Sequence, residues 1–293
     1  MLRGSITALL TPFKDGAVDE KAYSDFVDWQ IREGTHGLVP VGTTGESPTV
    51  THEEHRRVVK ICIEAADGRV PVVAGAGSNS TAEAVALARF AQEAGADAIL
   101  SLVPYYNKPN QEGIFQHFSA IASAIDLPVV LYSVPGRTVV DVTVDTIARL
   151  RDAHSNIIGV KDATADMGKA SQERAKLGED FILLSGEDMT ALGFNAHGGT
   201  GCISVTSNVA PRLCAQMQDA CHQGDFKTAL SIQDRLVHLH RALFIDPNPI
   251  GVKYAASRLG LCRNELRLPL VPASETTMAA VDAALVHAGL LEG

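Results

Sequence analysis

The sequence predicts a (β/α)8 TIM barrel followed by a C-terminal extension of three helices. Short runs rich in Val, Ile, Leu and Ala alternate with longer segments whose apolar residues recur at helical spacing, which indicates parallel strands joined by crossover helices. The strand-like runs are continuously apolar, as is typical of strands buried on both faces. The length of 293 residues allows one domain or two, and a single barrel of this class takes about 250 residues.

Eight β/α units follow one another without a gap. The predicted strands are Ser5–Leu10, Gly37–Val41, Val70–Ala74, Ala98–Val103, Pro128–Tyr132, Ile157–Lys161, Phe181–Ser185 and Gly201–Val205. The predicted helices are Glu20–Glu33, His52–Ala66, Thr81–Ala94, Gln111–Ile125, Val144–Arg151, Met167–Leu177, Asp188–Asn195 and Ala210–His222.

Local signals mark where several of these helices begin and end. Thr51 followed by Glu54 forms the pattern of a capping box, in which the two side chains satisfy free amide groups of the first helical turn. Glycine ends a helix well because it adopts the left-handed conformation without steric cost. Such glycines stand after four of the predicted helices: Gly34, Gly68, Gly95 and Gly178.

Three further helices are predicted after the eighth unit, over Phe226–Leu243, Ile250–Leu259 and Ser274–Ala288. Proline-containing segments separate them. The chain is therefore predicted to divide into a catalytic barrel, residues 1–223, and a helical extension, residues 224–293.

Composition argues against several classes of protein. The chain carries 25 Lys+Arg against 34 Asp+Glu, a net charge of −9, and lacks the basic face that binding to nucleic acid requires. Its longest apolar stretches are far shorter than the roughly 20 residues of a membrane span. The N-terminal segment from Met1 to Ser5 leads directly into a strand and does not resemble a signal peptide. We therefore expect a cytoplasmic protein.

The five cysteines do not suggest a disulfide framework or a zinc site. They are scattered, odd in number and without a C-x-x-C pair, so we expect small buried residues. Other short motifs also fail. The segment from Gly75 to Ser80 lacks the third glycine of a dinucleotide fingerprint, and His52 to His55 does not match the zinc-protease pattern.

Unusual residues stand at the carboxyl ends of the predicted strands, where such barrels carry their chemistry. The segment from Gly42 to Ser47 contains Thr43 and Thr44 between two glycines, which suits either a carboxylate-binding loop or an ordinary turn. Tyr105 and Tyr106 follow the fourth strand and place two phenols at the mouth, although paired tyrosines are more often packing residues.

The fifth and sixth strands carry the most informative residues. Tyr132 lies at the end of the fifth, and Arg137 follows it; a guanidinium can bind a carboxylate through two hydrogen bonds or form a surface ion pair. Lys161 ends the apolar sixth strand. Burial there would lower the pKa of its amine and leave it able to attack a carbonyl, unless it pairs with Asp162 or Glu187. Gly186 and Ile203 also lie at this mouth.

A desolvated amine beside phenols suits Schiff-base chemistry on a keto acid, in which the amine condenses with the ketone and a tyrosine moves the protons. The mouth lacks a cluster of His, Asp and Glu that would suit a divalent metal. We therefore expect neither a metal nor an organic cofactor.

Three segments resemble the signatures of the pyruvate-dependent class I aldolase/lyase superfamily, and within it the dihydrodipicolinate synthase family. They are Gly42–Glu46, the pattern from Tyr132 to Thr138, and Ile158–Asp162. The likeness covers essentially the whole chain. Arg137 with Tyr106, and the segment Asn248–Lys253, favour the synthase branch.

The resemblance implies a lyase of lysine and diaminopimelate biosynthesis that joins pyruvate to L-aspartate 4-semialdehyde. It implies that Lys161 forms the Schiff base and that Tyr132 donates and accepts protons, in a relay with Thr43 and with a Tyr106 that crosses from a neighbouring subunit. Thr44 would hold the pyruvate carboxylate. Further roles are implied for three residues: Arg137 on the carboxylate of the second substrate, and Ile203 and Gly186 at the pyruvate site.

The resemblance also implies a homo-oligomer, usually a tetramer, and an inhibitory L-lysine site at a subunit interface. The residues that match this site are Ser47, His52, His55, Asn79, Glu83 and Tyr105; alternatively, the two histidines only decorate a helix start. Two positions depart from the family: Ser133 stands where Asn is usual, and Gly251 where proline is common.

Two other functions are compatible with parts of this pattern. Another aldolase of the superfamily, for N-acetylneuraminate or a 2-keto-3-deoxy sugar acid, would keep Lys161 and Tyr132 but recognise a polyol, whereas Arg137 favours a short carboxylated aldehyde. A keto-acid sensor without catalysis would be expected to lack Lys161 or Tyr132, and both are present.

Overall fold

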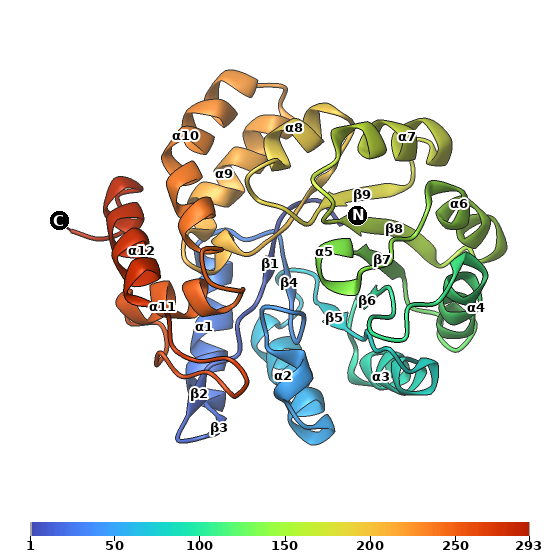
Figure 1. Cartoon of the computed structure of the whole chain (residues 1–293), viewed down its shortest axis with the longest axis horizontal. Coiled ribbons are helices and arrows are strands. Elements are labelled where there is room, and N and C mark those ends of the chain that lie inside the picture. The colour runs from blue at the N-terminus through green and yellow to red at the C-terminus, as the bar shows by residue number, and fades with distance from the viewer. Residues whose placement is uncertain (1, 293) are drawn as a thin grey trace.

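Eight parallel strands form one curved sheet, as the sequence predicts, and their order in it is β4-β1-β10-β9-β8-β7-β6-β5. The computed structural model describes residues 2–292. A parallel bridge between Leu38 and Val72 joins the two edges of the sheet, so the barrel is nearly closed (Figure 1). The strands are β1 (Gly4–Ala8), β4 (Gly37–Val39), β5 (Val73–Gly75), β6 (Ala98–Leu102), β7 (Val129–Ser133), β8 (Ile157–Asp162), β9 (Ile182–Ser185) and β10 (Gly201–Ser204).

Helices surround the barrel and cover the outer face of the sheet (Figure 1). The helices are α1 (Glu20–Arg32), α2 (His52–Ala66), α3 (Thr81–Ala94), α4 (Gln111–Ala122), α5 (Pro135–Thr138), α6 (Val144–Ala153), α7 (Met167–Leu177), α8 (Ala191–Ala196), α9 (Pro211–His222), α10 (Phe226–Ala242), α11 (Ile250–Arg258) and α12 (Glu275–His287). The eleven longer helices lie where the sequence predicts them, with ends shifted by up to three residues.

The structure corrects the prediction at a few places. Helix α8 begins at Ala191 and not at Asp188, because the Asp188 carboxylate instead accepts hydrogen bonds from the amides of Val205 and Thr206, at 2.9 and 3.1 Å. The short helix α5 was not predicted. Neither was the hairpin of β2 (Phe13–Lys14) and β3 (Ala17–Val18), which turns through Asp15 and Gly16 at positive φ.

The predicted helix signals are confirmed. Thr51 and Glu54 form a complete capping box at the start of α2. The four glycines predicted to end helices all have positive φ, between 67° and 95°.

Four cysteines are buried and Cys262 is half-buried. Along residues 2–292, none of the helices has the length and apolar character needed to cross a membrane.

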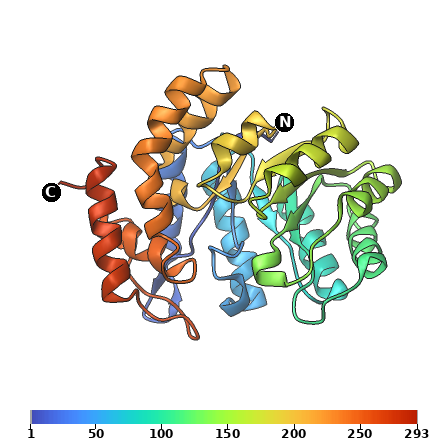
Figure 2. The same ribbon diagram turned by 45° about the horizontal axis from the view of Figure 1, so that its top comes forward.

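The three C-terminal helices lie together on one side of the barrel (Figure 1, Figure 2). Helix α10 contacts α9 and α12, and α12 contacts α11. The division into residues 1–223 and 224–293 stays a prediction, and its outer limits, Met1 and Gly293, lie outside the described residues.

A buried ion pair joins this extension to the loop after β4. Lys253 of α11 donates to the Glu46 carboxylate, and both side chains are excluded from solvent. Glu46 also accepts from the Arg267 amide at 3.1 Å, and the Lys253 ammonium lies 4.3 Å from the Phe13 ring centroid. Burial lowers the pKa of Lys253, whereas the Glu46 charge acts in the opposite direction. The extension therefore holds the loop that carries Thr43 and Thr44.

Removing one partner of this pair should destabilise the protein strongly. Lys253→Met leaves the Glu46 carboxylate buried without its counter-ion, and we expect a loss of about 3–5 kcal/mol in the free energy of unfolding, measured with urea. The double variant Lys253→Met/Glu46→Gln removes the buried charge and should recover part of that loss. An unchanged urea midpoint in the single variant would show that the pair does not hold the extension.

Candidate active site

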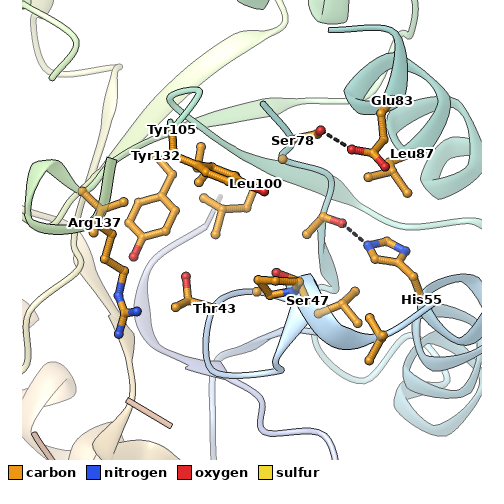
Figure 3. A pocket seen from close by; sticks show the side chains of 18 of the residues that line it. Thr43, Ser47, His55, Ser78, Glu83, Leu87, Leu100, Tyr105, Tyr132 and Arg137 are labelled. Atoms are coloured by element: carbon orange, nitrogen blue, oxygen red, sulfur yellow. Dashed lines mark hydrogen bonds between the residues drawn. The ribbon is translucent and has the colours of Figure 1, made fainter. Parts of the chain in front are cut away.

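A cavity of about 430 Å³ opens at the carboxyl ends of the barrel strands. Its walls come from β5, β6 and β7, from the segments that follow β4 to β7, and from helices α2 and α3. Figure 3 shows the side chains that line it. Thr43, Tyr132 and Arg137 turn their polar ends toward the same part of this space (Figure 3). The structure therefore brings together three of the residues that the sequence predicts for the site.

Lys161 lies deeper in the barrel, directly against Tyr132. The two residues are partners in the register of β7 and β8, and both side chains are buried, with 5% of Lys161 exposed. The Lys161 ammonium lies 4.1 Å from the centroid of the Tyr132 ring. The strand register therefore brings an amine and a phenol side by side, two groups that suit amine attack on a carbonyl and proton transfer.

The ion pairs that would give Lys161 a purely structural role do not form. The Asp162 carboxylate bonds to the amide and hydroxyl of Thr164, at 2.7 and 2.6 Å. The Glu187 carboxylate accepts from the amide of Thr190 at 3.0 Å. Both candidate partners are therefore engaged elsewhere, and the Lys161 amine faces the interior of the barrel.

Gly186 and Ile203 complete the surroundings of Lys161. A Cβ atom at Gly186 would lie 3.0 Å from the Lys161 Cε and 2.6 Å from the Ala163 Cβ, so only glycine leaves room for the lysine in this position. Ile203 of β10 is buried in the same apolar cluster as Tyr132. Gly186 therefore borders the Lys161 side chain, and Ile203 packs in the apolar cluster that includes Tyr132.

The loop after β4 presents its two threonines differently. Thr43 lines the cavity, whereas Thr44 is buried and its hydroxyl accepts a hydrogen bond from the Asn248 side-chain amide at 3.0 Å. The loop turns back on itself through bonds from the Gly45 and Glu46 amides to the Gly42 and Thr43 carbonyls, both at 3.1 Å. A Cβ at Gly45 would lie 3.0 Å from the Val41 Cα, so the turn requires glycine.

Asn248 is a site residue to which sequence reasoning gave no role. Besides its bond to Thr44, its carbonyl accepts from the Arg137 guanidinium at 3.1 Å. Asn248 precedes α11 and is far from both partners in the sequence, so only the folded chain reveals the contact. The only sequence signal for it is its place in the segment Asn248–Lys253, which resembles the family.

The two tyrosines after β6 do not both lie at the mouth, contrary to the sequence interpretation. Tyr105 lines the cavity. Tyr106 is 87% exposed and is not among the cavity residues of this chain, because its positive φ of 66° turns the backbone away. A relay role for Tyr106 therefore stays a prediction that needs a second subunit.

The residues predicted for an L-lysine site mostly line the far part of the same cavity. Ser47, His52, His55, Glu83 and Tyr105 all contribute to its wall. Asn79 does not; its carbonyl accepts from the Asn107 amide at 2.9 Å.

The two histidines of this set differ in environment. His52 is exposed and lies 3.1 Å from the Glu83 carboxylate. His55 is buried, its Nε2 lies 2.9 Å from the Gly75 carbonyl, and burial lowers its pKa to about 4. Ser78, which the sequence reasoning did not name, donates to Glu83 (Figure 3). His55 is therefore part of the cavity wall and is not simply a polar residue at the start of a helix.

Fold and site together define a class of protein: (β/α)8 barrels with a buried lysine on the sixth barrel strand, packed on a tyrosine of the fifth, the arrangement of Schiff-base-forming lyases. Within residues 2–292, no three or more His, Cys, Asp or Glu side chains are grouped so that they could hold a metal ion.

The chain belongs to the dihydrodipicolinate synthetase family, whose model matches residues 1–288. It is 62% identical to the 4-hydroxy-tetrahydrodipicolinate synthase of Parvibaculum lavamentivorans over 99% of this chain and all of the relative. Its fold matches the chloride-inhibited dihydrodipicolinate synthase of Acinetobacter baumannii, solved in complex with pyruvate, with a TM-score of 0.97, 43% identity, and 99% and 100% of the two chains covered.

A second solved structure, the enzyme of Cyanidioschyzon merolae with lysine bound, matches with a TM-score of 0.96 and 36% identity over 99% of each chain. Because these matches extend over whole chains, the likeness includes the barrel and the C-terminal helices alike.

Proposed function

We propose that the chain condenses pyruvate with L-aspartate 4-semialdehyde to give 4-hydroxy-tetrahydrodipicolinate, the first committed step of diaminopimelate and lysine biosynthesis. The observation that carries this proposal is the buried Lys161 amine 4.1 Å from the Tyr132 ring, beside a cavity that also holds Arg137. Relatives that share about 60% of the sequence bear the name of this enzyme.

The reaction proceeds through an imine. The Lys161 amine attacks the ketone carbon of pyruvate and water leaves, which forms the covalent Schiff base. Loss of a methyl proton gives an enamine, whose carbon attacks the aldehyde of the second substrate. The amine of that substrate then attacks the imine carbon, which closes the ring and releases Lys161.

Each of these steps moves a proton at the mouth of the barrel. Tyr132 donates and accepts these protons in this scheme, and the support is that its ring packs on Lys161 and its hydroxyl turns toward the cavity (Figure 3). Thr43 extends the relay from the opposite wall. In this scheme the imine activates the methyl carbon, so the reaction uses no metal and no organic cofactor.

Three residues orient the substrates. Thr44 holds the pyruvate carboxylate through its amide and hydroxyl, and the bond from Asn248 fixes the direction of that hydroxyl. Ile203 supports the methyl side of pyruvate from the barrel interior. Arg137, held by the Asn248 carbonyl, binds the carboxylate of the aldehyde substrate, which favours this substrate over the polyols of the other aldolases.

We further propose a homo-oligomer, in the form of a tetramer, in which Tyr106 enters the site of a neighbouring subunit. The support is the exposure of two large side chains, 87% for Tyr106 and 72% for Val139, which follows α5. Exposed apolar side chains of this kind fit a surface that a second copy covers. A cytoplasmic location stays a prediction.

The proposed reaction predicts a clear substrate preference. Pyruvate with aspartate semialdehyde should give product in an assay coupled to a dihydrodipicolinate reductase, whereas N-acetylneuraminate and 2-keto-3-deoxy sugar acids should not be cleaved at a comparable rate. Arg137→Leu should raise the KM for the semialdehyde more than that for pyruvate, because it removes one carboxylate contact. Preferential cleavage of a sugar acid would favour the alternative aldolase function.

Gly186→Ala should impair catalysis through a purely steric effect. The added methyl group would meet Lys161 Cε and Ala163, and we expect kcat/KM to fall by about 100-fold, since a shift of roughly 1 Å can have this effect. Gly193→Ala in α8 is the matched control, because its Cβ would lie 3.6 Å from Met167 in ordinary contact. Equal activity of the two variants would argue against this position for Lys161.

Inhibition by L-lysine is the regulatory part of the proposal. The Glu83 carboxylate, held between Ser78 and His52, can receive an ammonium group of lysine at the far end of the cavity. Millimolar L-lysine should lower initial rates at low pyruvate, and Glu83→Gln should weaken this inhibition at least tenfold. Glu53→Gln, at an exposed position of α2, is the control. If L-lysine leaves the initial rates of the protein without substitutions unchanged, the regulatory hypothesis is wrong.

A further inference from the structure

A second set of polar residues lies directly behind Lys161 and Tyr132. One position further along the two strands, Ser133 of β7 is the register partner of Asp162 of β8. Successive side chains of a strand point to opposite faces, so these two residues face the outer helices while Tyr132 and Lys161 face the barrel interior. Both are buried.

Lys169 of α7 enters this space and connects the residues in it. Its ammonium lies 2.8 and 3.0 Å from the two oxygens of Asp141, 3.3 Å from Asp162 and 3.3 Å from the Ser133 hydroxyl. The Ser133 hydroxyl in turn donates to Asp141. One cation therefore links the ends of β7 and β8 to the segment that precedes α6.

The charges in this cluster make the cation necessary. Glu173 of α7, 3.9 Å from the Lys169 ammonium, is completely buried; burial, then the Asp162 charge, raises its pKa to about 8. Burial alone would lower the pKa of Lys169, but the charges of Asp162 and Asp141 raise it. Without the Lys169 cation, the carboxyl groups of Asp141, Asp162 and Glu173 would still lie close together, and those of Asp162 and Glu173 are buried.

We propose that Lys169 is a positioning residue for the imine reaction: by tying Ser133, Asp141 and Asp162 together behind the site, it holds the ends of β7 and β8 so that Lys161 lies against Tyr132. This inference rests on the proposed function. It also explains the departure at Ser133, because a short hydroxyl fits between Lys169 and Asp141 and makes a bond with each.

The test measures the rate of imine formation by rapid mixing with saturating pyruvate, quenching with borohydride and quantifying the adduct on Lys161. Lys169→Met keeps the length of the side chain and removes the charge, and we expect this rate to fall by about tenfold or more. The pyruvate concentration for half-saturation should change less than about twofold, since Thr44 and its contacts are untouched. Lys169→Arg, which restores the cation, should recover the rate to within about threefold.

Lys176→Met is the matched control on the same helix, because Lys176 is exposed and pairs with Asp145 on the surface; its rate should equal that of the unmodified protein. If Lys169→Met does not fold, Ser133→Ala and Asp141→Asn carry the test, each with an expected loss of several-fold at unchanged half-saturation.

The proposal is overturned if the folded variants form the imine as fast as the protein without substitutions. It is also overturned if Lys169→Met and Lys169→Arg lose the same fraction of that rate, because such a result indicates a structural role alone. Absence of any adduct in the unmodified protein would instead overturn the proposed function, and with it the reaction that this positioning serves.

Discussion

The register between β7 and β8 is the constraint on which the rest of the site depends. It makes Tyr132 the partner of Lys161 and Ser133 the partner of Asp162. Because side chains alternate along a strand, one pair faces the barrel interior and the other faces the helices. A slip of one residue would exchange the two faces and place a carboxylate and a hydroxyl where the amine and the phenol now lie.

Two long-range connections support this arrangement from outside the barrel. On one side, the cation of Lys169 ties the outward-facing residues of β7 and β8. On the other, the extension holds the threonine loop through Lys253 and Glu46 and reaches Thr44 and Arg137 through Asn248. The C-terminal extension therefore helps to hold the residues of the site in position, although it contributes no strand to the barrel.

The sequence predicts what depends on local pattern. Continuous apolar runs locate the eight strands, and a lysine at the end of such a run marks Lys161 as unusual. The contacts of Asn248 with Thr44 and of Lys253 with Glu46 join residues more than 200 positions apart, and no local periodicity reports them. The sequence around Lys169 predicts an ordinary exposed lysine on a helix, and its burial follows only from how α7 packs. The exposure of Tyr106 goes together with a positive φ, which a tyrosine in the sequence does not predict.

Borohydride reduction in the presence of pyruvate, followed by peptide mass mapping, shows whether Lys161 forms a covalent imine with pyruvate. Incubation with pyruvate and borohydride should add one reduced pyruvate to the peptide that contains Lys161, and the Lys161→Ala variant should remain unmodified under the same conditions. If a different lysine is modified, or if the protein without substitutions gains no adduct, Lys161 does not form the imine.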